Sequence, residues 1–237
     1  MKLGIIGAMS VEVETLKQQM SDLTISNRAG MEFFEGRLNG LAVVVVVCGV
    51  GKVNAALCVQ VLCDCYGVTH LVNTGVAGSL CADLDIGDLV IGKDAIYHDF
   101  DCHVLNDSYV VGQVPGIPVR TFPADGRLVE FAFSAAEHVQ KGHVHMGRIA
   151  SGDQFICSAD HKRTIIDNTG ALCTEMEGAA IAHAAWRNKV PFVIIRAISD
   201  KADNSAEMDF PTFEAIAAKQ CAAVTMAFAG LLAGDAI

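Results

Sequence analysis

The sequence predicts an α/β protein in which a mainly parallel sheet lies between layers of helices. Short apolar segments rich in β-branched residues alternate with helical segments along the chain. Several strand-like segments are apolar on both faces, as is typical of strands that helices cover from each side. The chain has 237 residues, 52% of them hydrophobic, and shows no repeat, linker or low-complexity tract. We therefore expect a single domain over residues 1–237.

Seven strands are expected from the apolar segments. The clearest contains five consecutive Val residues, and branching at the β-carbon favours a strand over a helix there. The expected strands are residues 3–7, 41–48, 71–74, 89–96, 145–150, 171–174 and 192–198.

Four helices are expected between the strands. Ser10 is the expected N-cap of the first helix, and Gly67 is the expected C-cap of the second. Pro211 suits the first turn of the last helix, whose apolar residues recur at helical spacing. Residues 99–122 form a long irregular excursion, and such a loop in a compact domain is often functional or lies at an interface. The expected helical ranges are residues 11–20, Lys52–Tyr66, residues 178–189 and about 211–232.

The overall charge and the cysteines limit the partners and the compartment. The net charge is −10 and no cluster of Lys and Arg offsets it, so nucleic acid and membrane surfaces are not expected partners. No apolar stretch reaches transmembrane length without charges or turn signals, and the N-terminus does not resemble a secretory signal. The nine Cys residues form no Cys-x-x-Cys pair and mostly lie in apolar segments, as buried free thiols do. We expect a soluble cytoplasmic protein.

Three acidic residues each follow a strand-like apolar segment. They are Glu12, Glu177 and Asp200. In open α/β sheets, ligands bind outside the carboxyl ends of the strands. Three carboxylates that converge there indicate acid–base chemistry on a neutral or weakly basic substrate.

Other residues near these strand ends have two interpretations each. Glu175 lies on the same strand face as Glu177, or both carboxylates simply stabilise the N-terminus of the next helix. Arg196 lies within an otherwise apolar strand and needs a partner or a polar cavity. Phe155 follows another strand and could stack on a flat ring. The glycines of residues 73–78 either bring backbone amides to a ligand or form only a tight turn.

Three motifs that would indicate other functions are incomplete. Residues 48–52 resemble a phosphate-binding loop, but Val53 stands where Ser or Thr would bind magnesium. Gly4 and Gly7 do not complete a dinucleotide-binding fingerprint. Residues 98–103 carry two His, two Asp and one Cys, but these match no metal-ligand spacing. We expect a structural or interface role for that segment, and no metal.

Nine segments of the sequence occur in the order and at the spacing of one known family. They are GIIGAM with Glu12, GVGKVNAA, NTGVAG, GDLVI, YHDFD, GQVPG, SGDQFI, TEMEGAAIAH and VPFVIIRAISDKAD. From Met1 to about Ala223, the chain resembles the 5′-methylthioadenosine/S-adenosylhomocysteine nucleosidases, within the wider nucleoside phosphorylase superfamily. The match is specific because it depends on the whole ordered set rather than on one motif.

The resemblance implies both a fold and a reaction. The fold is a three-layer α/β/α sandwich with a mixed, barrel-like central sheet, as in nucleoside phosphorylases. The reaction is hydrolysis of the N-glycosidic bond of 5′-methylthioadenosine, S-adenosylhomocysteine and related adenine nucleosides, with release of adenine. The resemblance also implies a homodimer and no metal or organic cofactor. The pathway stays open among methionine salvage, quorum-signal precursor formation and menaquinone synthesis. The preferred 5′-substituent stays open among methylthio, homocysteinyl, deoxy and the bulkier group of a futalosine-type nucleoside.

The resemblance also assigns roles by position in the family motifs. Asp200 would donate a proton to adenine N7, and Glu12 would activate the attacking water. Arg196 would orient that water and Glu12, while Glu177 would bind the ribose hydroxyls. The other residues that it places at the substrate are Val76, Ala77, Gly78, Phe155, Ile156, Glu175, Met176, Ser199, Ala202 and Phe210, and those that it places at the 5′ pocket of a partner subunit are Tyr109 and Pro115.

One residue departs from the family pattern, and two other functions stay open. Val76 stands where many relatives carry a hydroxyl that helps to hold the water. A purine nucleoside phosphorylase would share the fold, but the glycine-rich turns carry no Arg to bind phosphate, and Glu12 would repel that anion. A non-catalytic nucleoside-binding protein would not need all three carboxylates.

Overall fold

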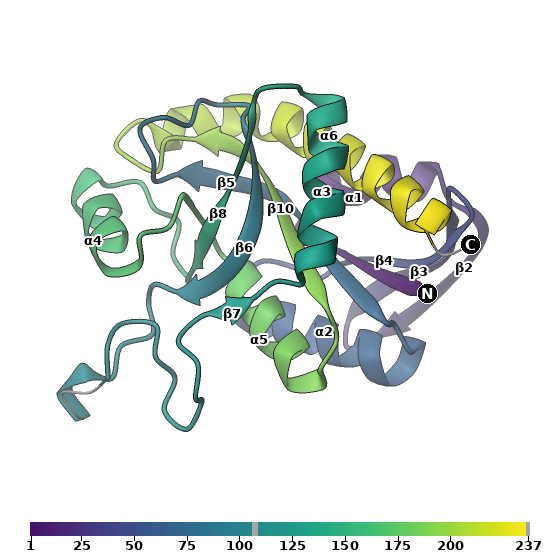
Figure 1. Ribbon diagram of the computed structural model, residues 1–237, viewed down its shortest axis with the longest axis horizontal. Coiled ribbons are helices and arrows are strands. Elements are labelled where there is room, and N and C mark those ends of the chain that lie inside the picture. The colour runs from purple at the N-terminus through teal and green to yellow at the C-terminus, as the bar shows by residue number, and fades with distance from the viewer. Residues whose placement is uncertain (106–108, 236–237) are drawn as a thin grey trace.

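The expected alternation of strands and helices is present in the structure, a computed structural model that describes residues 1–105 and 109–235 (Figure 1). The strands are β1 (Lys2–Gly7), β2 (Ser21–Arg28), β3 (Met31–Leu38), β4 (Leu41–Val47), β5 (His70–Ser79), β6 (Leu89–Tyr97), β7 (Phe122–Pro123), β8 (Val144–Ser151), β9 (Cys173–Glu175) and β10 (Phe192–Asp200). The helices are α1 (Ser10–Gln18), α2 (Lys52–Tyr66), α3 (Gly126–Val139), α4 (Ala159–Thr169), α5 (Gly178–Asn188) and α6 (Ala206–Asp235), with a short 3-10 helix, η1, over His103–Leu105.

The strands of the described residues form one mixed sheet in the order β10-β6-β8-β9-β5-β1-β4-β3-β2, with β7 beside β6. A further pairing of β10 with β5 closes the five strands β10, β6, β8, β9 and β5 into a barrel. The centre is parallel, because β5 pairs in parallel with both β1 and β10. β10 runs antiparallel to β6, and β5 runs antiparallel to β9. The expected mixed, barrel-like sheet is therefore confirmed.

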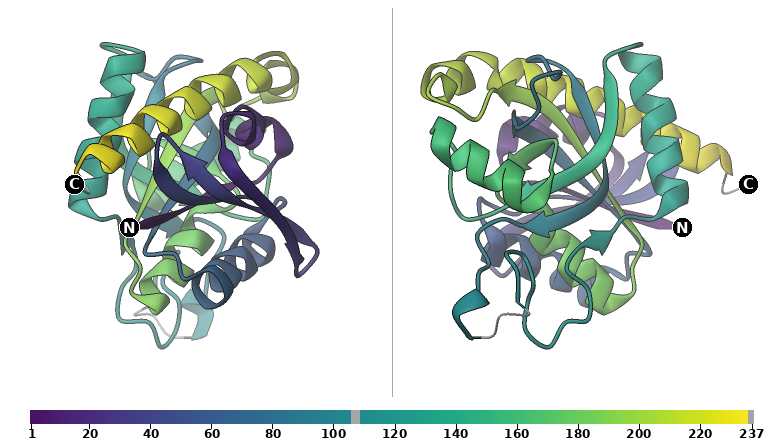
Figure 2. Two further views of the ribbon diagram at one scale, coloured as in Figure 1. Left: turned by 90° about the vertical axis from the view of Figure 1, so that its right-hand side faces the viewer. Right: turned by 60° about the vertical axis from the view of Figure 1, so that its left-hand side comes forward.

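Helices cover both faces of the sheet, so the fold has three layers (Figures 1 and 2). α1, α3 and α6 lie on one face, over a core that includes Val43 and Ile195. α2 and α5 lie on the other face, over a core that includes Val44 and Ile194. Successive residues of one strand thus enter opposite cores, which explains why these strands are continuous apolar runs in the sequence.

The boundaries of the first two helices test the expected caps. α1 begins at Ser10 and its N-cap is Met9, so the expected Ser10 cap is wrong by one residue. The physical reason is that the Glu12 carboxylate accepts the backbone N–H of Met9 at 2.9 Å and turns the chain one residue earlier. α2 ends as expected, with Gly67 in the left-handed conformation at φ 60°.

The last helix is longer than expected. α6 begins at Ala206, because the turn of residues 203–205 supplies its first backbone hydrogen bonds, so Pro211 lies inside the helix rather than in its first turn. By length and composition alone α6 could cross a membrane. It carries Pro211, Glu214 and Lys219, so it does not contradict the expectation that no stretch of that length is free of charges and turn signals. Half of the most apolar 18-residue stretch of α6 is buried inside the protein, as in the core helix of a globular domain.

Some elements had no clear sequence signal. The hairpin of β2 and β3, the short β7, and the helices α3 and α4 were not expected. β2 is an edge strand with mostly exposed side chains, so it lacks apolar alternation. Its turn is Ala29-Gly30, where both residues have positive φ. Residues 99–122 are irregular as expected: their described part contains only η1 and the start of β7, and it extends away from the barrel (Figure 1, lower left).

Candidate active site

The ends of four strands meet around one pocket. β1, β5 and β10 run in parallel, so their carboxyl ends lie at the same edge of the sheet. β9 pairs with the end of β5 and brings its own last residues to the same place. The main pocket is lined by Ala8, Met9, Glu12, Val50, Val76, Ala77, Gly78, Phe155, Thr174, Glu175, Met176, Glu177, Ser199, Asp200 and Phe210. A smaller adjoining hollow shares several of these residues, including Phe155 and Asp200, and adds Gln154 and Ile156.

Glu12 is held in one orientation by the backbone. Its Oε2 accepts the N–H groups of Ala8 and Met9 at 2.7 and 2.9 Å, and its Oε1 accepts the N–H of Val76 at 3.2 Å. Only 3% of the residue is exposed. Burial raises the pKa of Glu12, while the nearby Arg196 and the three backbone donors oppose that rise. Glu12 is therefore a carboxylate able to take up a proton inside the pocket.

Asp200 is held at the end of β10 by two donors. Its Oδ1 accepts the N–H of Ala202 at 2.8 Å, and its Oδ2 accepts the hydroxyl of Ser199 at 2.9 Å. Burial raises the pKa of Asp200; those two donors oppose the rise, and the negative charges of Asp209 and Asp203 add to it. Asp200 therefore holds a proton more readily than an exposed Asp does.

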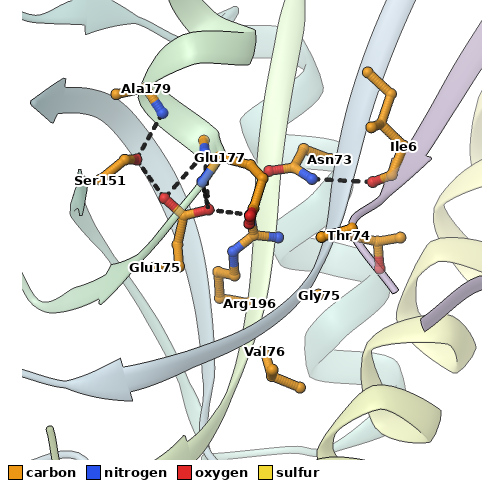
Figure 3. A network of polar contacts seen from close by, with 12 residues as sticks. Ile6, Asn73, Thr74, Gly75, Val76, Ser151, Glu175, Glu177, Ala179 and Arg196 are labelled. Carbon is orange, nitrogen blue, oxygen red and sulfur yellow. Dashed lines mark hydrogen bonds and ion pairs between the residues drawn. The ribbon is translucent and has the colours of Figure 1, made fainter. Parts of the chain in front are cut away.

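Arg196 and Glu175 form a buried ion pair behind the pocket (Figure 3). The Nη2 of Arg196 donates to Glu175 and also to the side-chain oxygen of Asn73. Glu175 additionally accepts the hydroxyl of Ser151 and the backbone N–H groups of residues 177 and 178. Burial lowers the pKa of Arg196, but the carboxylates of Glu175 and then Glu12 more than offset this, so the guanidinium stays charged.

Glu177 is the third carboxylate of the predicted trio and also lines the pocket. Its Oε1 accepts the N–H of Gly51 at 2.8 Å, and the residue is 6% exposed. Burial raises the pKa of Glu177, and the negative charge of the neighbouring Glu175 raises it further. The side chain therefore has free hydrogen-bonding capacity toward the pocket and a tendency to hold a proton when nothing is bound.

An apolar wall stands opposite the carboxylates. Phe155 is 46% exposed, and its ring meets that of Phe210 edge to face with 5.5 Å between centroids and an interplanar angle of 75°. Met9, Val50 and Met176 extend this wall. A flat, largely apolar ligand with polar edges matches a pocket of this kind.

Comparisons with known proteins agree with this geometry. The family model described as Phosphorylase superfamily matches residues 2–230. A protein of Oceanobacillus iheyensis named 5′-methylthioadenosine/S-adenosylhomocysteine nucleosidase is 40% identical over 223 residues, which cover 94% of this chain and 96% of that protein. The chain belongs to this nucleosidase family. The family resemblance of the sequence motifs is therefore confirmed.

Two solved structures with the same fold bear on the ligand. A 5′-methylthioadenosine/S-adenosylhomocysteine nucleosidase of Colwellia psychrerythraea, in complex with adenine, is 37% identical with a TM-score of 0.93, over 98% of this chain and 96% of that chain. The futalosine hydrolase of Helicobacter pylori is 30% identical with a TM-score of 0.90, over 96% of each chain. Both likenesses confirm the nucleoside phosphorylase-like fold.

Most of the expected site residues surround the pocket. Arg196 and Ala202 lie behind it, where they contact Glu175 and Asp200 respectively, and Ile156 lines only the adjoining hollow. Glu175 reaches the pocket wall, but protein donors occupy its oxygens, so its direct contact with a substrate stays a prediction. The residues that line the main pocket as expected are Glu12, Val76, Ala77, Gly78, Phe155, Glu175, Met176, Glu177, Ser199, Asp200 and Phe210.

Two expected residues lie elsewhere, and several others were missed. Tyr109 and Pro115 lie in the irregular segment of residues 99–122 and do not line the pocket of their own chain. Five further residues line the pocket or the adjoining hollow without having been expected there, namely Ala8, Met9, Val50, Gln154 and Thr174. Ala8 and Met9 directly follow β1, so the strand-end rule that selected Glu12 could have found them too.

The polar side chains of residues 98–103 contact neighbouring side chains. Within residues 1–105 and 109–235, no group of three or more His, Cys, Asp and Glu side chains could hold a metal ion. Asp99 instead pairs with Lys52 at 2.6 Å, and Asp101 contacts His103 at 2.6 Å. These contacts are those of a structural segment.

Proposed function

We propose that the chain hydrolyses the N-glycosidic bond of 5′-methylthioadenosine, S-adenosylhomocysteine and related adenine nucleosides, releasing adenine and the 5′-substituted ribose. One observation carries the proposal: the described lining of the pocket and its adjoining hollow includes Glu12, Glu177 and Asp200 but no Lys or Arg. Such a lining suits a neutral nucleoside and water, and it repels an anionic nucleophile.

The leaving group would be activated by Asp200. Adenine is a poor leaving group as an anion, so a proton on N7 is needed as the C–N bond breaks through an oxocarbenium-like state. An Asp can supply that proton more readily where its environment raises its pKa, and burial does this for Asp200, with the negative charges of Asp209 and Asp203 adding to the rise. Phe155 and Ile156 line the adjoining hollow together with Asp200, so we place the adenine ring there.

The water would be activated on the other side of the sugar. Glu12 takes a proton from the attacking water while the water oxygen bonds to the anomeric carbon. The electron pair of the broken N-glycosidic bond stays with the adenine, which is protonated at N7. The three backbone N–H donors fix the Glu12 carboxylate for this transfer. Glu177 accepts hydrogen bonds from the ribose hydroxyls, and its charge stabilises the positive sugar in the transition state.

A phosphorylase is the main alternative, since that superfamily includes enzymes that use phosphate in place of water. Phosphate recognition needs convergent cationic donors. The nearest buried cation, Arg196, lies behind the pocket and is paired with Glu175. The experiment that decides is adenine release from 5′-methylthioadenosine with and without inorganic phosphate. We expect equal rates and free 5-methylthioribose, whereas a phosphate requirement and a ribose 1-phosphate product would overturn the proposal.

The 5′-substituent is proposed to be small and apolar or thioether-like. Met9, Val50 and Phe210 contribute apolar side chains to the wall of the pocket, and a methylthio group would bury its methyl against them. The same assay on a panel of 5′-methylthioadenosine, S-adenosylhomocysteine, 5′-deoxyadenosine and futalosine ranks kcat/KM for each. A marked preference for futalosine would favour the activity for which the Helicobacter pylori relative is named.

We further propose a homodimer in which residues 99–122 of one subunit reach the pocket of the other. This segment extends from the barrel and carries Tyr109 and Pro115 (Figure 1). Val53 and Leu57 of α2 are exposed, at 71% and 49%, beside a shallow hollow, and apolar side chains of this size favour burial in an interface. Leu57→Glu should yield a monomer by light scattering with reduced adenine release. A stable dimer in that variant would contradict this interface.

We propose that the protein is cytoplasmic and serves methionine salvage. All nine cysteines are free thiols, which fits a reducing cytoplasm. Hydrolysis of 5′-methylthioadenosine would return its adenine and thioether carbon skeleton to methionine salvage. The ranking of the nucleoside panel tests this placement, because a salvage enzyme must turn over 5′-methylthioadenosine efficiently.

A further inference from the structure

Asn73 links Arg196 to β1, the strand that precedes Glu12. It lies in β5, is fully buried, and uses both ends of its side chain (Figure 3). Its Nδ2 donates to the carbonyl oxygen of Ile6 at 3.0 Å, and its Oδ1 accepts from Nη2 of Arg196. We propose that Asn73 is a positioning residue that holds Arg196 beside Glu12 for the hydrolysis proposed above.

Arg196 and Glu12 approach each other at Gly75. A methyl group placed on Gly75 would lie 2.5 Å from Oε1 of Glu12 and 2.9 Å from Nη1 of Arg196. The guanidinium therefore borders the carboxylate that activates water, and its positive charge favours the ionised form of that carboxylate. This electrostatic effect depends on where the guanidinium lies, because charge interactions inside a protein fall off with distance and are weakly screened.

Glu175 alone would not fix that position. Arg196 is almost fully buried, and its Nη1 has only a long contact of 3.3 Å to the carbonyl of Ile195. Its Nε has no hydrogen-bond partner among the described residues. Nη2 is thus the anchored end of the guanidinium, because it donates one hydrogen bond to Glu175 and the other to Oδ1 of Asn73. Two acceptors on different strands define the plane of the guanidinium, whereas one would leave it free to rotate.

The other end of Asn73 ties Arg196 to the strand that supports Glu12. Ile6 and Asn73 are the last residues paired between β1 and β5, and the same Asn73 pairs with Ile194 of β10. Just beyond this point β1 ends, and the backbone N–H groups that follow it hold Glu12. One side chain therefore fixes both the cation and the backbone that orients the base.

The test compares two variants of Asn73 with a matched control. Asn73→Ala removes both hydrogen bonds, and Asn73→Asp keeps the size and an acceptor for Arg196 but adds a negative charge. The control is Thr225→Val, an isosteric change at a fully buried site. Thr225 lies in α6, and its hydroxyl is 2.9 Å from the hydroxyl of Thr74, the neighbour of Asn73 in β5. Among the described residues, the hydrogen-bond partners of the Thr225 hydroxyl are Thr74 and the carbonyl of Cys221, and not Arg196. Thermal unfolding measures stability for each, and adenine release from 5′-methylthioadenosine gives kcat, KM and their pH dependence.

The expected results separate positioning from simple support. Asn73→Ala should lower kcat by about tenfold or more, with KM changed by less than about threefold, because the interaction lost acts in the transition state. Asn73→Asp should move the acid limb of kcat/KM to higher pH, since its charge offsets that of Arg196 at Glu12. Thr225→Val should keep both the rate and the pH profile of the wild type.

Three results would overturn the inference. They are a folded Asn73→Ala with near-wild-type kcat, an acid limb unmoved in Asn73→Asp, and the same loss of kcat in Thr225→Val. If Asn73→Ala does not fold, the profile of Asn73→Asp decides alone. Adenine release by the wild type tests the proposed function itself, whereas the inference is read from the ratio of each variant to the wild type, so the two fail separately.

Discussion

Replacement of Asp200 by Asn removes one proton donor from the pocket and little else. The carboxyl group has two partners, the N–H of Ala202 at 2.8 Å and the hydroxyl of Ser199 at 2.9 Å. The Asn side chain can accept the N–H of Ala202 with its amide oxygen and place its NH₂ group opposite the Ser199 hydroxyl. The Ser199 proton can then turn toward the carbonyl of Ala77, which is 3.4 Å away. The variant should therefore fold with its hydrogen bonds nearly intact.

The expected loss of rate follows from the role of the missing proton. A general acid typically contributes about 10²–10⁴-fold, which corresponds to about 3–5 kcal/mol of transition-state stabilisation. Because adenine cannot leave readily without protonation at N7, we expect the upper end of that range for Asp200→Asn. Nucleoside binding should persist, because the contacts offered by Phe155 and Glu177 are unchanged.

The assay is single-turnover release of adenine, with ligand binding and thermal unfolding measured on the same samples. The folded-state pKa of Asp200 is raised, so the stability that it contributes as a neutral acid is lost as pH rises through that value. The Asn variant has no such loss and should be at least as stable as the wild type at pH 8. Its residual activity should also lack the decline at high pH that deprotonation of Asp200 causes. A folded variant with near-wild-type turnover would refute the role of Asp200 as the acid.

Three further changes test the other parts of the site. Glu12→Gln should lower kcat by about 10²–10⁴-fold while nucleoside binding, followed by calorimetry, is retained; loss of binding in a folded variant would contradict the role as base. Glu177→Gln should gain stability over the wild type as pH rises from about 5 to 8, by up to about 1.4 kcal/mol per pH unit, because the raised pKa of Glu177 makes its ionised form costly. Denaturant unfolding at four pH values checks this, and a difference that does not vary with pH would count against it. Val76→Thr adds a hydroxyl beside Glu12 at nearly constant volume and should raise kcat about fivefold, the value of roughly one hydrogen bond to the water; an unchanged or lower kcat would show that the water needs no such group.

The strands and their ends could be predicted because they follow from local pattern. Continuous apolar runs such as β4 and β10 fit only strands covered on both faces, and parallel strands gather their carboxyl ends at one edge. That rule placed Glu12, Glu177 and Asp200 in one pocket without knowledge of the strand order. β2 could not be found in this way, because an exposed edge strand has no apolar face to reveal it.

The partners within the site could not be predicted, because they depend on strand register. Arg196 was expected to need a partner, but its pairing with Glu175 requires β9 to end against β5 where β10 passes on the other side. Asn73 gave no signal beyond its place in residues 73–78, which were expected to form a turn and instead continue β5 to Ser79. Its role follows only from the register that brings Ile6 and Ile194 to either side of it. Local sequence thus gives the chemical groups of the site, and the sheet topology decides which of them touch.

The same topology explains how two buried carboxyl groups can play opposite roles. Burial is the largest influence on both Glu12 and Asp200, and it raises the pKa of each. Their neighbouring charges differ in sign. Glu12 faces the positive charge of Arg196 and three backbone donors, all of which favour the carboxylate. Asp200 has two donors that favour the carboxylate, but the negative charges of Asp209 and Asp203 favour the acid. An acid and a base at one pH need such a difference in surroundings. Because Arg196 is the main attractive charge at Glu12, loss of its fixed position should raise the pKa of Glu12 and weaken its role as the base.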